Sequence, residues 1–174
     1  MTASQALDTL FTAPPVPAPP IDLKTGASWV NPPSYPAAIE DTNSDQETLF
    51  SYFKAWHLEQ ARLSGNNLSE RITYFFHTHI PAAWSVINSS EALYYQNVLY
   101  RYYAFGSFKE LFKKMCLDNA MLRYIDGETN DKDSPNENFA REMFELYSIG
   151  RGAQLAEGNY TNYTETDIKA ACRV

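Results

Sequence analysis

A segment of about three helical turns, from Ser134 to Leu146, carries a dense group of side chains that could do chemistry. It holds three carboxylates, one arginine and two carboxamides. Ser134 could cap the helix, Pro135 suits the first helical position, and Glu137 falls where a capping box needs an acidic residue. Gly150 is a natural stop signal. The segment therefore predicts a helix with a well-specified start.

The faces of this helix decide what its polar residues could do. Spacing at i, i+4 places Glu137, Arg141 and Glu145 in one row, with Asn138 and Glu142 on the adjacent stripe. Three interpretations stay open: a buried structural network, a functional site, or an exposed ladder whose pairs contribute about 0.3–0.5 kcal/mol each. As a site, the row could orient carboxylates or bind an anion. The candidate binding residues are then Asn136, Glu137, Asn138 and Arg141, and the candidate catalytic carboxylates are Glu142 and Glu145.

His77 and His79 are the other candidates for catalysis or metal binding. Two residues apart on a helix, their rings point about 200° from each other, so they share a metal only if the helix ends there. Pro81 favours such an ending. Packing histidines, an acid/base role for one of them, and a metal site completed by Glu142 or Glu145 all stay open.

The acidic loop from Asp126 to Asp133 partly matches a calcium-binding EF-hand. Oxygen-bearing side chains fall at the first, third and fifth positions, and Glu137 falls at the twelfth. The sixth position is Asp131 instead of glycine, and Pro135 interrupts the loop. The loop therefore predicts turns, and Asp126 is a metal candidate only on the partial match.

The helix also carries a family resemblance. With the stretches at 147–150, 159–161 and 164–173, it resembles the signature of the bacterial "domain of unknown function 1800" family. Stretches at 74–80, 101–108 and 121–126 resemble that family too, so the similarity spans about residues 68 to 173. The resemblance implies no activity, since the family's activity is unknown. It does imply an exported bacterial protein, periplasmic or extracellular, that is longer at both ends than this chain.

Composition excludes several classes of function. The 174 residues have a formal net charge of −7, which argues against a nucleic-acid partner. No apolar run approaches the roughly 20 residues that span a bilayer. Residues 1–7 have neither a basic region nor an apolar core, so no signal peptide is predicted in this chain. Cys116 and Cys172 form no C-x-x-C pair and are expected to be buried free thiols.

The predicted fold is all-α: an irregular multi-helix bundle with a proline-rich extended N-terminal arm. The arm covers residues 1–43, because prolines between 12 and 37 favour extended chain. Residues 44–174 form the helical domain, where capping signals such as Ser44 with Glu47 precede apolar stripes. The residues expected to be buried in its core are Phe53, Phe76, Leu111, Met115, Met143 and Tyr147.

Two functions fit these patterns. The first is a helical binding or scaffold module of an exported protein, with an unknown protein or carbohydrate partner. The alternative is a hydrolase with an acid/base or metal-assisted site formed by His77 or His79 and the carboxylates Glu142 and Glu145. The sequence identifies no cofactor. Because a family member normally continues beyond the last helix, we expect uncovered apolar surface near Ile168 and Cys172 and self-association of the fragment.

Overall fold

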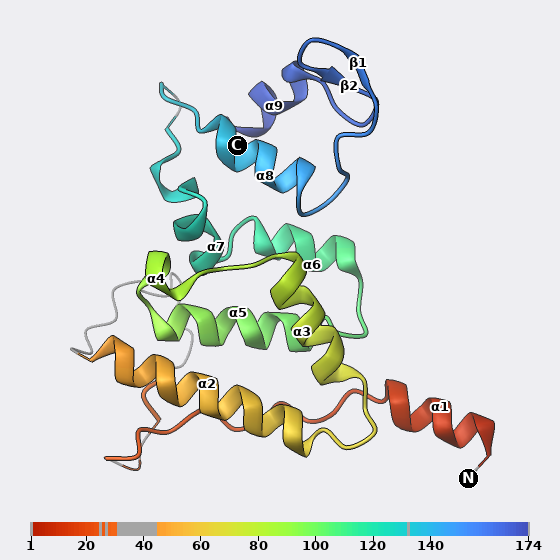
Figure 1. Cartoon of the computed structure of the whole chain (residues 1–174), viewed down its shortest axis with the longest axis vertical. Coiled ribbons are helices and arrows are strands. Elements are labelled where there is room, and N and C mark those ends of the chain that lie inside the picture. The colour runs from red at the N-terminus through yellow and green to blue at the C-terminus, as the bar shows by residue number, and fades with distance from the viewer. Residues whose placement is uncertain (1, 25, 27, 31–44, 132, 174) are drawn as a thin grey trace. The chain divides into compact units, whose positions relative to one another are not determined.

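A computed structural model describes residues 2–24, 26, 28–30, 45–131 and 133–173. It divides the chain into two compact units, Met1–Leu111 and Phe112–Val174. Both are mainly helical, as the all-α prediction required, and the second unit adds a two-stranded sheet (Figure 1). None of the described helices is long and apolar enough to cross a membrane. The domain boundary predicted between residues 43 and 44 lies outside the described residues.

Helix α5 is the centre of the first unit. This unit contains α1 (Ala3–Phe11), α2 (Gln46–Leu63), α3 (Ser69–His79), α4 (Trp84–Ile87) and α5 (Ser90–Tyr102), and α6 (Phe108–Met115) begins in it. Helices α2, α3 and α4 all pack on α5, and Figure 1 shows α2 and α5 running side by side. Apolar residues of α5 are buried beside three polar ones, Ser90, Gln96 and Asn97, so the core of this unit includes polar groups.

Local sequence signals explain where these helices begin. Ser89 accepts a hydrogen bond from the amide of Ala92 and caps α5. Asp45 caps α2 through the amide of Thr48, while Ser44, the predicted cap, lies outside the described residues.

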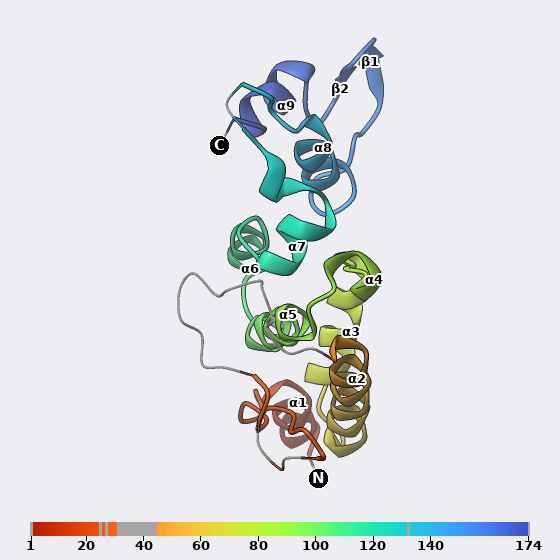
Figure 2. The ribbon, with the colours of Figure 1, turned by 90° about the vertical axis from the view of Figure 1, so that its left-hand side faces the viewer.

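The N-terminal region combines a helix with extended chain. The prediction of an extended arm is wrong for residues 3–11, which form helix α1 because a reciprocal pair of hydrogen bonds between Thr2 and Gln5 caps its start. Residues 12–20, which follow α1, have no regular secondary structure and run along α2 (Figures 1 and 2). We call this segment the strap.

The second unit contains α7 (Asn119–Tyr124), the short 3-10 helix η1 (Gly127–Thr129), α8 (Glu137–Glu145) and α9 (Glu165–Ala171). Strands β1 (Gln154–Ala156) and β2 (Asn159–Tyr160) form an antiparallel pair between α8 and α9 in the sequence. Helices α8 and α9 pack together. Their shared core is formed by Ala140, Tyr163, Ile168 and Cys172.

Burial tests the predictions about the core. All six residues expected to be buried are buried, which confirms those assignments. The expectation of uncovered apolar surface near Ile168 and Cys172 is wrong, because these side chains are 0% and 1% exposed. Ala140 and Tyr163 cover them within the unit itself. Both cysteines are free; Cys172 is buried and Cys116 is partly buried.

Candidate functional site

Helix α8 begins two residues later than predicted. The side chain of Asn136, not that of Ser134, accepts a hydrogen bond from the amide of Phe139 at 3.2 Å and caps the helix. The Asn136 amide group also donates to the carbonyl oxygen of Asp126 at 2.7 Å. Glu137 is therefore the first helical residue, and its predicted place in a capping box is wrong. Asparagine and serine are about equally good caps, and the contacts of Asn136 with Asn130 and Asp126 in the preceding loop select Asn136.

Arg141 bridges two helices. Its guanidinium lies 2.7 Å from Glu165 of α9, against 3.4 Å from Glu137 and 4.0 Å from Glu145 of its own helix. The hydrogen bond to Glu165 is the main cause that raises the pKa of Arg141, and the same bond lowers the pKa of Glu165. The predicted row along α8 exists, but its closest contact is with another helix.

The carboxylate of Glu145 accepts hydrogen bonds from two other residues. Arg151 donates to it at 2.5 Å, and the hydroxyl of Tyr163 donates to its other oxygen. Burial, followed by the contact with Glu145, raises the pKa of Tyr163 to about 12. Because Glu145 is hydrogen-bonded to protein groups and 10% exposed, its contacts are those of a structural network.

The remaining α8 candidates lie apart from this network. Asn138 is exposed, and the side chain of the partly buried Glu142 makes no hydrogen bond or ion pair to the described residues. Glu142 instead contributes, after burial, to raising the pKa of Tyr147 to about 12. The α8 residues proposed for binding are thus divided between a helix cap, an interhelical ion pair and an exposed surface.

His77 and His79 point in different directions, as their spacing predicted. The ring of His79 stacks on Phe75 at 5.5 Å. The ring of His77 lies 5.3 Å from that of His57 and 4.8 Å from that of Tyr100, inside the first unit. Among the described residues, no group of three or more His, Cys, Asp or Glu side chains is arranged to hold a metal ion.

The other metal and hydrolase candidates belong to the second unit. Asp126 has a left-handed backbone with φ of 56° and precedes η1. The hydrolase hypothesis would combine His77 or His79 of the first unit with Glu142 or Glu145 of the second. That combination stays a prediction.

The first unit contains a polar network that the sequence patterns did not reveal. Glu70 of α3 forms an ion pair with Arg101 of α5, and the two side chains are 9% and 10% exposed. Arg101 also donates through Nε to Oδ1 of Asn97 at 2.6 Å. Nδ2 of Asn97 lies 2.8 Å from Nε2 of His77. A chain of hydrogen bonds therefore runs from Glu70 to His77 through the core.

This chain fixes the protonation of His77. A guanidinium only donates, so the oxygen of the Asn97 amide must face Arg101 and its nitrogen must face His77. The amide nitrogen only donates, so Nε2 of His77 accepts and carries no proton. Burial, with a contribution from His57, lowers the pKa of His77 to about 3. Burial, with a contribution from Arg101, lowers the pKa of His57 to about 4. Both imidazoles are neutral at pH 7.

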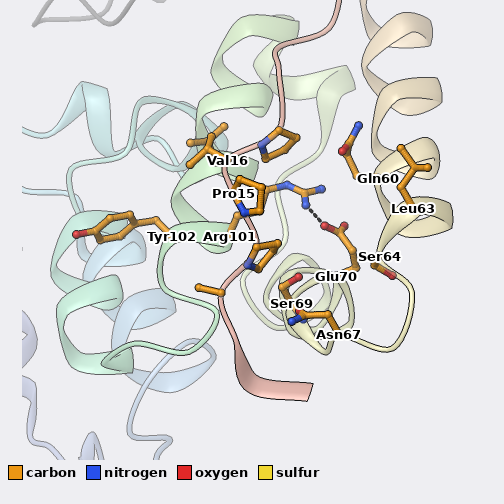
Figure 3. Close-up of a pocket in the computed structure, with 14 residues that line it drawn as sticks. Pro15, Val16, Gln60, Leu63, Ser64, Asn67, Ser69, Glu70, Arg101 and Tyr102 are labelled. Carbon is orange, nitrogen blue, oxygen red and sulfur yellow. Dashed lines mark hydrogen bonds and ion pairs between the residues drawn. The ribbon is translucent and has the colours of Figure 1, made fainter. Parts of the chain in front are cut away.

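A pocket of about 360 Å³ lies against the ion pair. Figure 3 shows Glu70 and Arg101 pointing toward each other, with Pro15 and Val16 of the strap on one side and Gln60 of α2 on another. Oε2 of Glu70 and Nη2 of Arg101 are buried and have no hydrogen-bond partner among the described residues. Desolvation by burial lowers the pKa of Arg101 to about 10, which leaves it charged at neutral pH.

Sequence reasoning missed this pair because its members stand 31 residues apart and resemble ordinary surface charges. The available signal was Asn97 and Arg101 at i, i+4 on a helix rich in tyrosine, where a buried arginine needs an amide partner. Only the packing of α3 on α5 brings Glu70 to them.

Comparison with known proteins places the chain in a family. No curated protein and no solved structure matches it. The whole chain, residues 1–174, matches one family, which covers and extends the resemblance seen at residues 68 to 173. The chain therefore belongs to the family described as "Protein of unknown function (DUF1800)".

Proposed function

We propose that this protein is a non-catalytic binding module whose pocket at the Glu70–Arg101 pair takes a small, neutral, hydroxyl-rich molecule such as a monosaccharide. One observation carries the proposal: Glu70 and Arg101 line a pocket, and each has a buried polar atom, the acceptor Oε2 and the donor Nη2, without a partner among the described residues. An unpartnered buried polar group costs about 1–3 kcal/mol, and more when it is charged. A ligand that offers both a donor and an acceptor removes this cost.

The charge of the site supports a neutral ligand. Glu70 and Arg101 neutralise each other, so an added ion would meet no excess of opposite charge. Burial of an unpaired ion is far more costly than burial of a hydroxyl group. The chain's net charge of −7 further disfavours an anion.

The walls of the pocket support a ring-shaped ligand. Pro15, Val16, Leu63 and Tyr102 provide apolar surface, and Gln60 adds an amide at the rim. A volume of about 360 Å³ lies in the range of small-molecule sites, roughly 300–1,000 Å³. Apolar walls with a few fixed polar groups suit a sugar ring, which has an apolar face and a hydroxylated edge.

The histidines next to the ion pair support binding over catalysis. With pKa values of about 4 and 3, His57 and His77 are weak bases at neutral pH. Nε2 of His77 is already occupied by Asn97. Among the residues that the structure describes, no contact within either unit favours the hydrolase alternative. Export of the native protein is part of this proposal, supported by the family resemblance alone.

The test is a titration of the isotope-labelled full chain with monosaccharides, followed by NMR. Glucose and galactose should shift the amide signals of Glu70, Arg101 and Gln60, while glucuronic acid and glucosamine should bind more weakly. Tyr102→Ala should weaken binding without breaking the ion pair, and Tyr74→Ala, exposed on α3 outside the pocket, should not. Tighter binding of a charged sugar, shifts elsewhere, or no response to any neutral sugar would overturn the proposal.

A further inference from the structure

We propose that α2 and the start of α3 form a recognition site for an extended proline-rich protein segment, and that the chain's own strap occupies it. The strap contains five prolines among nine residues. This inference goes beyond the small-molecule pocket, because it concerns a protein segment and the groups that hold it.

The hydrogen bonds between the strap region and the helical body have one polarity. Nε1 of Trp56 donates to the carbonyl oxygen of Ala18 at 2.8 Å. Nδ2 of Asn67 donates to the carbonyl oxygen of Thr12 and, at 3.3 Å, to that of Thr9. The amide of Leu68 adds a bond to the carbonyl oxygen of Leu10 at 3.0 Å. In each bond the body supplies the donor and the N-terminal region supplies a carbonyl oxygen; Thr9 and Leu10 belong to the last turn of α1, and Thr12 and Ala18 belong to the strap.

This polarity matches the chemistry of a proline-rich segment. Proline has no backbone N–H, so such a segment can be held through its carbonyl oxygens but not through proline donors. An extended polyproline-type chain also makes no internal hydrogen bonds, which leaves its carbonyls available. Its backbone is already restricted, so binding orders it at a low entropic cost.

The two least exposed residues of the strap stand three positions apart. Pro17 is half-buried and Pro20 is buried, while residues 12–16, Ala18 and Pro19 are exposed. Residues three apart lie on the same side of a helix with three residues per turn. Pro17 and Pro20 therefore share the side of the strap that faces the body, in the P-x-x-P spacing that aromatic grooves bind.

The receiving face has the aromatic groups that this recognition mode uses. Trp56 and Tyr52 of α2 line a cavity of about 690 Å³ together with Pro17 and Pro20. Arg101 lies over the Trp56 ring at 5.1 Å, and Tyr94 lies 5.3 Å from it. These contacts fix the orientation of the indole ring, so the direction of its N–H does not depend on a bound segment.

The strap is attached in a way that permits exchange. The side chain of Val16 is 72% exposed, and cavities of about 360 Å³ and 690 Å³ flank the strap. The strap itself is thus held by the two hydrogen bonds to the carbonyl oxygens of Thr12 and Ala18 and by the packing of Pro17 and Pro20. The same segment supplied by a second molecule can make the same contacts.

The experiment weakens the strap in the full chain and supplies it again as a peptide. In a Pro17→Ser/Pro20→Ser variant, the indole N–H signal of Trp56 should move from its wild-type position. A peptide of residues 8–22 should restore that position, and the same peptide with both serines should not. The wild-type chain should bind the peptide at least about tenfold more weakly, because its own strap competes at a high effective concentration.

Two controls keep the result interpretable. Trp56→Phe keeps an aromatic ring but removes the donor, so it should reduce peptide binding in the weakened chain. A Pro20→Ser single variant replaces the double variant if the latter loses its helical circular dichroism signal. Equal binding of both peptides, or no recovery of the Trp56 signal, would overturn the inference.

Discussion

The guanidinium of Arg141 lies closer to Glu165 of α9, at 2.7 Å, than to either glutamate of its own helix. The contact joins α8 to α9 beside the core formed by Ala140 and Ile168. The ion pair between the two helices is therefore the shorter contact, and the contacts along α8 that the spacing predicted are longer. Since both partners are about one-third exposed, the ion pair contributes little to the free energy of unfolding. The apolar core between the two helices provides most of the stability.

The first prediction follows from this relationship. Glu165→Gln should lower the melting temperature slightly, and Glu137→Gln should lower it less, because Glu137 is farther from Arg141 and more exposed. High salt should reduce the difference. Thermal unfolding monitored by circular dichroism measures both variants. An equal or larger effect of Glu137→Gln would show that the row along α8 is the more important contact.

The second prediction concerns the buried pair of the first unit. Arg101→Ala should reduce the free energy of unfolding by about 3–5 kcal/mol, because it leaves Glu70 buried without its partner. Urea denaturation measures this loss. Arg62→Ala is the matched control: Arg62 also pairs with a glutamate, Glu59, but at the surface, so its removal should leave stability nearly unchanged.

The same pair allows a sharper test by double substitution. Replacing Glu70 and Arg101 together by leucine and methionine should recover part of the loss, since no unpaired charge then stays buried. If the loss of unfolding free energy in the double variant equals the sum of the losses in the two single variants, the contact between the two charges does not contribute to stability.

The third prediction concerns the core of the second unit. Ile168→Ala should cost about 2–5 kcal/mol, because Ile168 is fully buried among Ala140, Tyr163 and Cys172. Lys169→Ala, at the exposed neighbouring position, is the control and should have little effect. Unfolding followed by tyrosine fluorescence and circular dichroism measures the two variants. An Ile168→Ala variant with the wild-type free energy of unfolding would mean that α9 is not packed on α8 in solution.

The fourth prediction is a dependence of stability on pH. An unfolded histidine titrates near 6.5, whereas the pKa values of His57 and His77 are about 4 and 3 in the folded chain. Between these values the unfolded state binds more protons, so stability falls as the pH decreases below about 6.5. Each histidine contributes a slope of up to about 1.4 kcal/mol per pH unit.

Urea denaturation between about pH 5 and pH 7 isolates this effect, because carboxylates with lowered pKa values, such as Glu165 and Asp167, titrate at lower pH. His57→Phe should reduce the slope, since it removes one of the two buried imidazoles. A variant with the wild-type slope would mean that His57 is protonated as easily in the folded chain as in the unfolded one.

Local sequence signals were sufficient for the helical class and much of the core. Caps, apolar stripes and breakers act within a few residues, so they predicted Phe53, Met115 and Met143 as buried and His77 and His79 as divergent. The start of α8 was misplaced by two residues, because the loop holding Asn136 decides between two good caps.

Only the tertiary structure decided which charges meet. Glu70 and Arg101 lie on different helices, and their side chains become a buried pair because α3 packs on α5. Likewise Arg141 finds Glu165 through the docking of α9, and Trp56 finds Ala18 through the path of the strap. The sequence by itself determines helices through contacts between near neighbours. It leaves these pairs undetermined because they join residues 24 to 38 positions apart, which no helical period relates.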